Sequence, residues 1–242
     1  WRKESGLLVA GKRVVQVDAT RRIWGDQGFR LFLSHKSEVK KDSAELKDRL
    51  SIFGISCFVA HEDIHPTKAW QDEIENALAS MDAFVALMTQ NFHDSDWTDQ
   101  EVGFAIARGV PIIAVRLGMD PYGFIGKFQA LSSTWLTVAE DLVKVLIKND
   151  RIFSAYVQAL RKCTSWDSGN TMAKALPGIE KLSKLQIDDL VAAYNENSEL
   201  RGSFGFNGKS TKFYGPGLVS HLNLLGARQF TFANSGLIVA VG

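Results

Sequence analysis

The chain has 242 residues, of which 45% are hydrophobic and 23% charged, and its formal net charge is +1. These proportions are ordinary for a folded globular protein, and the near-zero charge gives no reason to expect a nucleic acid, a membrane surface or an acidic partner. No apolar run approaches the roughly 18 residues of a membrane span, and no signal peptide is visible, so we expect a cytoplasmic protein. Cys57 and Cys163 are far apart and fit no zinc spacing, which predicts two free thiols and no metal site.

Short apolar runs alternate with helical periodicity after a mixed lead-in segment, residues 1–28, that carries a weak strand signal at 13–17. This alternation predicts an α/β domain at 29–163, built as a flavodoxin-like, doubly wound parallel sheet with helices on both faces. The expected strands are 29–33, 55–60, 83–88, 110–115 and a short one at 134–137. The expected helices are 39–53, 70–81, 97–108, a short one at 125–131 and a long one at 141–161.

The composition changes beyond residue 163, and we expect a small α+β region at 164–242 whose role the sequence does not reveal. Two apolar runs flank the turn signal Asn234-Ser-Gly236, which predicts a terminal β-hairpin. The other expected features are a linker at 165–171, a helix within 179–200, a glycine-rich stretch at 202–217, a short helix at 218–225 and hairpin strands at 228–233 and 237–241.

The segment from Ser95 to Gly109 has the signals of a capped helix. Ser95 and Asp96 are good N-cap residues, and Gly109 stands where a helix ends in the left-handed conformation. Trp97 and Glu101 are four residues apart and would share one face of that helix. A nucleotide site could use the ring for stacking and the carboxylate for a ribose hydroxyl or a developing cation. The alternative is a tryptophan packed on the core beside a solvated glutamate.

Sites in doubly wound sheets form outside the carboxyl ends of the strands. This rule places three polar segments around one rim: Ser34-His35-Lys36-Ser37, the loop at 61–68 and the start of the 97–108 helix. Their clustering favours a functional role for Glu101 over a purely structural one.

Motifs for phosphate binding, dinucleotide binding and nucleophilic catalysis are incomplete or absent in this sequence. Asn207-Gly-Lys-Ser210 resembles the end of a phosphate loop, but Ser203 stands where the first glycine is required. No glycine-rich dinucleotide fingerprint opens the first helix, and no nucleophile elbow surrounds Ser34 and His35. These absences argue against hydride transfer and serine-based hydrolysis.

Three boxes together resemble one known family. Phe32-Leu-Ser-His35 after the first strand resembles the opening box of Toll/interleukin receptor (TIR) domains of the bacterial kind. Cys57-Phe-Val-Ala-His-Glu-Asp63 resembles the second strand and the BB loop, and Trp97-x-x-x-Glu101 resembles the motif that carries the catalytic glutamate of NAD-cleaving TIR domains. The resemblance covers roughly residues 29–145, in the order that a TIR domain requires.

The resemblance implies an NAD glycohydrolase or cyclase, with NAD as substrate and no cofactor, acting in bacterial anti-phage defence and switched on by self-assembly. It implies Glu101 as the catalytic residue and Ser34, His35, Lys36 and Trp97 as substrate-binding residues. For Ser34, His35 and Lys36, capping of the first helix stays open as an alternative. The implied partners are further copies of the chain, joined by TIR–TIR contacts that include the loop at 61–70. Two other functions remain open: a non-catalytic TIR scaffold that acts by homotypic assembly, and a glycosyl transferase resembling nucleoside deoxyribosyltransferases.

Overall fold

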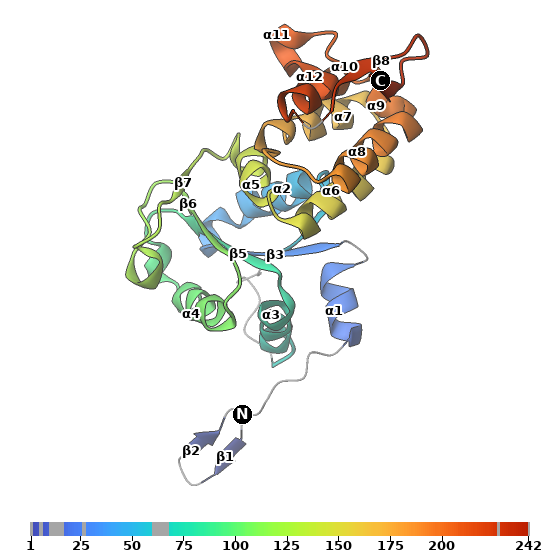
Figure 1. Ribbon diagram of the computed structural model, residues 1–242. Helices are drawn as coiled ribbons and strands as arrows, with labels where there is room; N and C mark the ends of the chain where they lie inside the picture. Colours follow the sequence, from blue (N-terminus) through green and yellow to red (C-terminus); the bar gives the residue numbers. More distant parts are fainter. Residues whose placement is uncertain are drawn as a thin grey trace.

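The computed structural model describes residues 2–4, 7–9, 17–25, 28–59, 68–226 and 228–241. A five-stranded parallel sheet in the order β4-β3-β5-β6-β7 forms the centre of the α/β part (Figure 1). This order is the flavodoxin-like one, so the predicted fold class is confirmed. The strands are β3 (Phe29–Ser34), β4 (Ile55–Val59), β5 (Ala83–Met88), β6 (Ile112–Arg116) and β7 (Leu131–Ser132).

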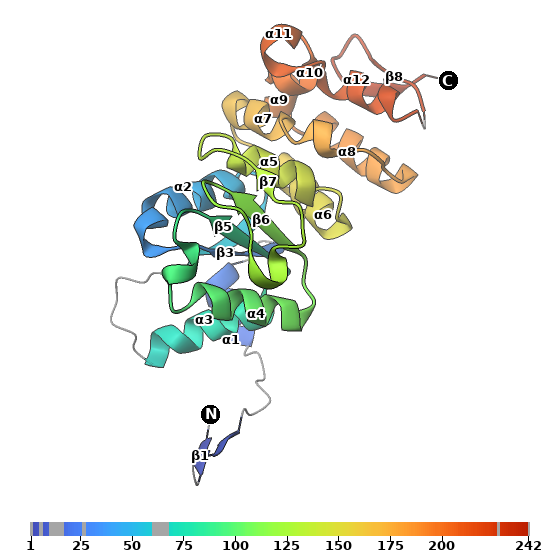
Figure 2. The same cartoon turned by 90° about the vertical axis from the view of Figure 1, so that its left-hand side faces the viewer.

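Helices cover both faces of the sheet (Figures 1 and 2). Alternate side chains of β3 therefore enter two different cores: Leu31 and Leu33 pack on one face and Phe32 on the other. All six residues of β5 are buried, as expected of a central strand between two helical layers. One face carries α1 (Val17–Trp24), α3 (Lys68–Ser80) and α4 (Thr98–Arg108), and the other carries α2 (Lys40–Ser51), α5 (Val138–Leu146) and α6 (Asp150–Arg161).

The helix α4 differs from the prediction at its start. It begins at Thr98, and its N-cap residue is Trp97, whose side chain makes no capping hydrogen bond. Ser95 instead accepts a hydrogen bond on its Oγ from the main-chain N–H of Trp97 at 3.3 Å, so the capping expected of Ser95 and Asp96 is wrong. The end of the helix is confirmed, because Gly109 has a φ of 65° and lies in the left-handed region.

Three further expectations for the α/β part are wrong. The long helix at 141–161 is two helices, because Asn149 caps α6 by accepting a hydrogen bond from the N–H of Arg151 at 2.9 Å. The fifth strand is β7, before the turn at 134–137, and the short helix near 125–131 is the 3-10 helix η3 (Gly123–Ile125). Two more 3-10 helices follow strands, η1 (Ser37–Val39) after β3 and η2 (Phe92–Asp94) after β5.

The lead-in segment contributes a core helix that the sequence pattern did not reveal. Trp24 of α1 is only 2% exposed, and its Nε1 donates a hydrogen bond to Ser80 Oγ at 2.8 Å. The main-chain oxygen of Trp24 accepts a hydrogen bond from Ser56 Oγ at 2.7 Å. The strand expected at 13–17 falls mostly outside the described residues, and Val17 begins α1. Upstream, β1 (Arg2–Glu4) and β2 (Leu7–Val9) form an antiparallel pair.

The C-terminal region is largely helical and ends in a β-hairpin. Both the predicted hairpin and the helix expected near 218–225 are confirmed. The linker expected at 165–171 is wrong, because Ser165 caps a helix there by accepting from the N–H of Ser168 at 3.1 Å. The elements are α7 (Trp166–Ala173), η4 (Leu176–Gly178), α8 (Lys184–Glu196), α9 (Ser198–Gly202), α10 (Phe204–Asn207), α11 (Thr211–Tyr214), α12 (Gly217–Leu224), β8 (Phe230–Phe232) and β9 (Ile238–Ala240). Within the described ranges, no helix has both the length and the apolar character needed to cross a membrane.

The C-terminal region shares a core with the sheet. The hydrophobic cluster beneath α2, α5 and α6 continues without a break into α7, α8, α12 and the hairpin. Asn197 closes the end of α6, because its Nδ2 donates to the main-chain oxygens of Leu160 at 3.0 Å and Cys163 at 2.9 Å. At Gly178 a Cβ atom would lie 2.6 Å from the Cα of Lys144, so η4 meets α5 too closely for any side chain.

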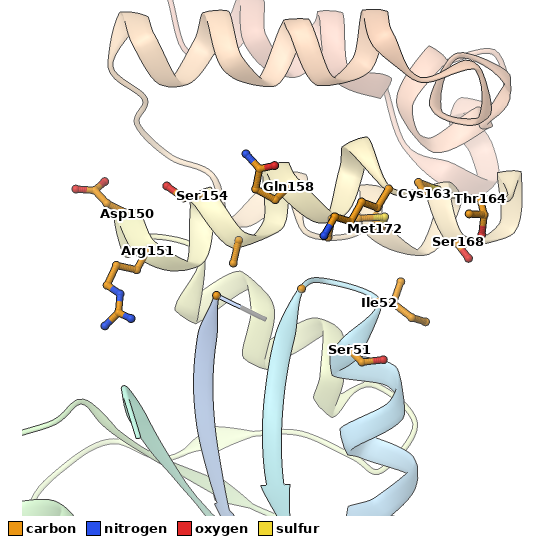
Figure 3. Close-up of a pocket in the computed structure, with 15 residues that line it drawn as sticks. Ser51, Ile52, Asp150, Arg151, Ser154, Gln158, Cys163, Thr164, Ser168 and Met172 are labelled. Carbon is orange, nitrogen blue, oxygen red and sulfur yellow. The ribbon is translucent and has the colours of Figure 1, made fainter. Parts of the chain in front are cut away.

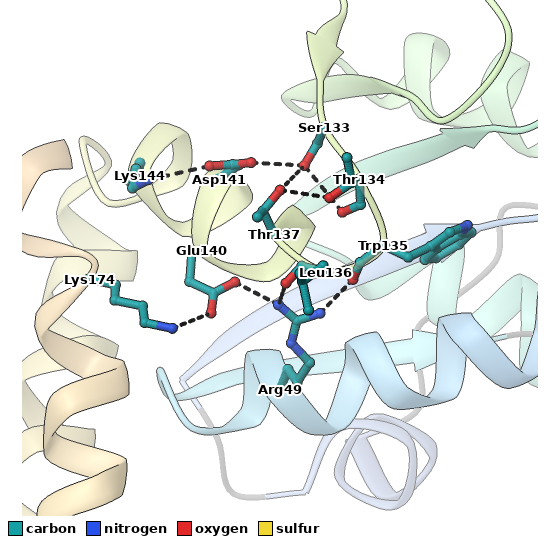
Figure 4. A network of polar contacts seen from close by, with 10 residues as sticks. All are labelled: Arg49, Ser133, Thr134, Trp135, Leu136, Thr137, Glu140, Asp141, Lys144 and Lys174. Carbon is teal, nitrogen blue, oxygen red and sulfur yellow. Dashed lines mark hydrogen bonds and ion pairs between the residues drawn. The ribbon is translucent and has the colours of Figure 1, made fainter. Parts of the chain in front are cut away.

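A polar network on the sheet face covered by α2 and α5 joins four segments (Figure 4). Glu140 of α5 forms ion pairs with Arg49 of α2 at 2.6 Å and with Lys174, just after α7, at 3.2 Å. Arg49 also donates hydrogen bonds to the main-chain oxygens of Trp135 and Leu136, each at 2.6 Å. The network therefore fixes the turn before α5 and the end of α7 to the same carboxylate.

The hairpin is held at both edges by asparagine side chains. Asn195 pairs with Ile238 through two hydrogen bonds, donating to its oxygen at 2.9 Å and accepting from its N–H at 2.8 Å. Asn223 makes the same pair with Phe230, at 3.1 Å and 2.8 Å. Both amides bind main-chain groups that point away from the partner strand, so each substitutes for a neighbouring strand at that position.

Acid is expected to weaken the docking of α12 through His221. The ring Nε2 lies 2.9 Å from the oxygen of Ile179, and burial lowers the pKa of His221 although the hydrogen bond to Ile179 acts in the opposite direction. A histidine with a depressed pKa binds fewer protons in the folded state, so its contribution to stability is complete above the ordinary value of 6.5 and declines as pH falls through the folded pKa. We expect the urea concentration at the unfolding midpoint to decrease when the pH is lowered from about 7.5 to 5.5. The decrease should be smaller in His221→Gln, which keeps an N–H donor. Equal losses in both proteins would contradict this assignment.

Candidate functional site

The candidate site lies where the strand order of the sheet reverses. The chain leaves β3 toward α2 on one face and leaves the adjacent β5 toward α4 on the other face. Both strands end at the same edge because they are parallel, with Ser34 opposite Ala86. Such a switch point is where open α/β sheets form their ligand sites.

Glu101 and Ser34 meet at this edge. Glu101 lies in the first turns of α4 and is 3% exposed, and Ser34, at the end of β3, is fully buried. The Oγ of Ser34 donates a hydrogen bond to Oε2 of Glu101 at 2.6 Å. Ionisable side chains are seldom this buried, and a short hydrogen bond of this kind holds the carboxyl group in one orientation. The structure thus brings together two sequence-predicted residues that are 67 positions apart.

Trp97 lies one turn before Glu101, at the N-cap of α4. Its main-chain oxygen accepts the hydrogen bond from the N–H of Glu101 at 2.9 Å, and its side chain is half-buried. The four-residue spacing therefore places both residues at the rim, although Trp97 itself precedes the helix.

His35 and Lys36 continue the rim from Ser34. His35 is buried, with Nδ1 3.3 Å from the main-chain oxygen of Leu33. Lys36 pairs with Glu38 at 3.0 Å and lies 3.9 Å from Asp94, which belongs to η2 after the neighbouring strand β5. Of these residues, Lys36 stands at the N-cap position of η1, but neither η1 nor α2 has a side-chain capping bond.

Tyr122, in the loop after β6, belongs to this rim and was not predicted. Its hydroxyl donates a hydrogen bond to Asp99 in the first turn of α4, and the ring of His93 packs edge-on against it at 5.8 Å between centroids. Burial raises the pKa of Tyr122, with further increases from the hydrogen bond to Asp99 and from the charges of Asp99 and Asp94, so the phenol stays protonated. Tyr122 thus ties the loop after β6 to the start of α4. The loop has no periodicity that could have revealed this role.

Two exposed aromatic side chains follow Tyr122 in the same loop. Phe124 is 77% exposed and Phe128 is 55% exposed. They give this part of the rim an apolar surface that the sequence analysis did not identify. The loop at 61–70, to which the sequence assigned TIR–TIR contacts, falls outside the described residues up to position 67, and α3 begins at Lys68.

Comparison with known proteins finds similarity in the segment that holds this site. Residues 31–145, a little under half of the chain, match the family model described as TIR domain. The crystal structure of the TIR domain of the Toll-related receptor TRR-2 from Hydra magnipapillata is similar at 19% identity, covering 48% of this chain and 90% of that chain with a TM-score of 0.38. No curated protein matches the chain. The matched segment runs from β3 through α5 and includes both Ser34 and Glu101, so the part of the chain that holds the candidate site is similar to TIR domains.

Proposed function

We propose that this TIR domain cleaves the nicotinamide–ribose bond of NAD+, releasing nicotinamide and either ADP-ribose or a cyclic ADP-ribose isomer. The observation that supports the proposal most is the buried carboxylate of Glu101, held at 2.6 Å by Ser34 at the switch point of the sheet. Clefts at such points accept nucleotides in many open α/β sheets.

The chemistry of the bond suits a site built around one carboxylate. The nicotinamide ring nitrogen of NAD+ is positively charged, and when the glycosidic bond breaks the electron pair goes to that nitrogen. The leaving group departs neutral and needs no general acid. The ribose carbon becomes oxocarbenium-like, and a fixed negative charge nearby lowers the energy of that state. Water then bonds to this carbon and loses a proton to solvent, which gives ADP-ribose, or a nucleophilic atom of the same ADP-ribosyl group bonds to it, which gives the cyclic isomer. In our proposal Glu101 supplies this charge and binds the ribose hydroxyls.

The neighbouring residues take supporting roles in the proposal. Trp97, half-buried beside Glu101 in the chain, would stack on a ring of NAD or wall the pocket. Ser34 would orient the carboxylate, and His35 and Lys36 would contact ribose or phosphate. Lys36 has two acidic partners, Glu38 and Asp94, that phosphate oxygens would replace.

The biological setting that we propose is bacterial anti-phage signalling in the cytoplasm, with activity switched on when copies of the chain assemble. The loop at 61–70 would take part in these TIR–TIR contacts. The exposed side chains of Phe124 and Phe128 add apolar surface to the rim beside the site. The same surface would serve a non-catalytic scaffold, so only an activity measurement separates the two functions.

The test is an assay of the full chain with NAD+ over a wide range of protein concentration, with nicotinamide and the ribosyl product separated by chromatography. We expect nicotinamide release whose specific rate rises with protein concentration, because assembly follows mass action. The identity of the ribosyl product distinguishes hydrolysis from cyclisation. Deoxynucleosides as substrates test the glycosyl transferase alternative. An assembled chain that releases no nicotinamide would reject the enzyme in favour of the scaffold.

A further inference from the structure

A cavity lies at the edge of the sheet where β3 and β4 begin (Figure 3), opposite to the edge that holds Glu101. It has a volume of about 680 Å³, within the usual range for small-molecule sites. Its walls come from the amino ends of β3 and β4, the end of α2, the whole length of α6 and one side of α7. A ligand here would therefore not compete with NAD at the rim. The lining residues are Gly28, Ser51, Ile52, Gly54, Asp150, Arg151, Ser154, Ala155, Gln158, Ala159, Lys162, Cys163, Thr164, Ser168 and Met172.

Two glycines let α6 lie close to the start of the strands that border this cavity. Gly28 and Gly54 immediately precede β3 and β4, so the chain enters both strands from a residue without a side chain. Gly54 has a φ of +79°, and a Cβ atom there would lie 2.6 Å from the main-chain oxygen of Ala155. No other residue fits that position, and α6 can pass close above the strand ends.

The cavity has an apolar surface and a polar one. Ile52, Ala155, Ala159 and Met172 supply aliphatic and thioether contacts, and Met172 is only 1% exposed. Hydroxyl and amide groups line the rest, from Ser51, Ser154, Gln158, Thr164 and Ser168. None of the described lining residues is aromatic, so the cavity offers no stacking surface for a nucleobase.

Lys162 gives one end of the cavity a positive charge, and the carboxylate of Asp150 lies at the other end, at the start of α6. Arg151 is paired with Asp82 at 2.6 Å, and Asp150 accepts a hydrogen bond from Gln186 at 3.0 Å. Lys162, the residue that ends α6, is exposed and has no ion pair within the described part of the chain. An anionic group at the mouth of the cavity would meet this ammonium group first.

We propose that this cavity binds an amphipathic organic anion. An aliphatic chain lies against Ile52, Ala155, Ala159 and Met172, and an acidic head group lies at Lys162 among the hydroxyl groups. The site belongs to the junction between the TIR domain and the C-terminal region, because Thr164, Ser168 and Met172 come from beyond α6.

The methionines give a direct test. The chain has four of them, and only Met172 lines this cavity. Met81 and Met88 are buried in the core on the other face of the sheet, and Met119 packs against that core. In the full chain labelled with [methyl-¹³C]methionine, we expect hexyl phosphate to shift the Met172 signal in a saturable manner and to leave the other three in place. Hexan-1-ol has the aliphatic chain without the phosphate, and inorganic phosphate has the anionic group without the chain. Both are expected to bind more weakly.

Three variants at exposed positions locate the site. Lys162→Glu is expected to weaken hexyl phosphate binding about tenfold, since it replaces an attraction near the surface by a repulsion. Lys181→Glu makes the same charge change at an exposed lysine outside the cavity and should leave binding unchanged. Gln158→Trp is expected to fill the cavity and abolish the shift.

A missing Met172 shift, a shift of Met88 or Met119 instead, or equal binding of hexan-1-ol and hexyl phosphate would each overturn the proposal. The test does not depend on NAD cleavage, because its readout is a methyl group at the edge of the sheet away from Glu101.

Discussion

Replacing Glu101 by glutamine is expected to lower the rate of nicotinamide release by about a thousandfold, the scale seen when one preorganised electrostatic contact is removed from an active site. The amide is close to the carboxylate in shape, and its oxygen can still accept the hydrogen bond that Ser34 donates at 2.6 Å. The fold should therefore survive while the negative charge is lost. Initial rates at saturating NAD+ and matched protein concentration, with melting temperatures measured alongside, check this expectation.

The matched control is Glu180→Gln, which makes the same chemical change at an exposed glutamate of the C-terminal region. Glu180 forms only a surface ion pair with Lys148 in the described structure, and such pairs contribute little. Its activity should stay close to that of the unmodified chain. If the Glu101 variant turned over NAD+ as fast as this control, Glu101 would not be the catalytic residue.

A chain that ends at residue 163 is expected to lose its cooperative folding transition. Such a chain keeps α6 but removes α7 and α8, which cover it, along with the hydrogen bond from Tyr156 to the main-chain oxygen of Met172 at 2.9 Å. Each large apolar side chain that becomes exposed costs about 1.5–3 kcal/mol. A few such losses equal the total stability of a typical domain, about 5–15 kcal/mol. Urea unfolding followed by circular dichroism, with the full chain in parallel, measures the effect.

Two leucines of α8 provide a milder version of the same experiment. Leu190 is fully buried, and Leu190→Ala should lower the free energy of unfolding by about 2–5 kcal/mol. Leu185 is 81% exposed, and the same substitution there should cost less than about 0.5 kcal/mol.

A chain ending at residue 163 that unfolded as cooperatively as the full chain would show that the shared core is dispensable. It would support a separate domain at 29–163.

The central sheet could be predicted because its strands are buried on both faces and read as uninterrupted apolar runs. The segment 83–88 coincides with β5 for this reason. Topology then placed Ser34 and Glu101 at one edge, since parallel strands end together. The hydrogen bond between them could not be predicted, because it depends on where α4 starts, and that start is set by η2 and Trp97 and not by the expected cap.

The helices that were missed depend on contacts that a sequence pattern does not show. The break between α5 and α6 coincides with the polar run at 148–151, which is short enough to be read as the exposed face of one long helix, and the cap at Asn149 marks it. The helix α7 has the polar composition of a linker. Its Gly169 allows close packing, since a Cβ atom there would lie 2.9 Å from the Cβ of Ser203. Tertiary packing thus decides the structure where local signals are weak.

The asparagine pairs on the terminal hairpin restrict how copies of this chain can join. An incoming strand that extended the hairpin would first have to displace Asn195 from Ile238 on one edge or Asn223 from Phe230 on the other, breaking two hydrogen bonds in either case. Exposed strand edges are the usual route to unwanted polymerisation, and this small sheet closes that route with side chains from the helices beside it. Growth of an assembly by strand addition at the C-terminus is therefore disfavoured, which leaves ordered polymerisation to other surfaces of the molecule.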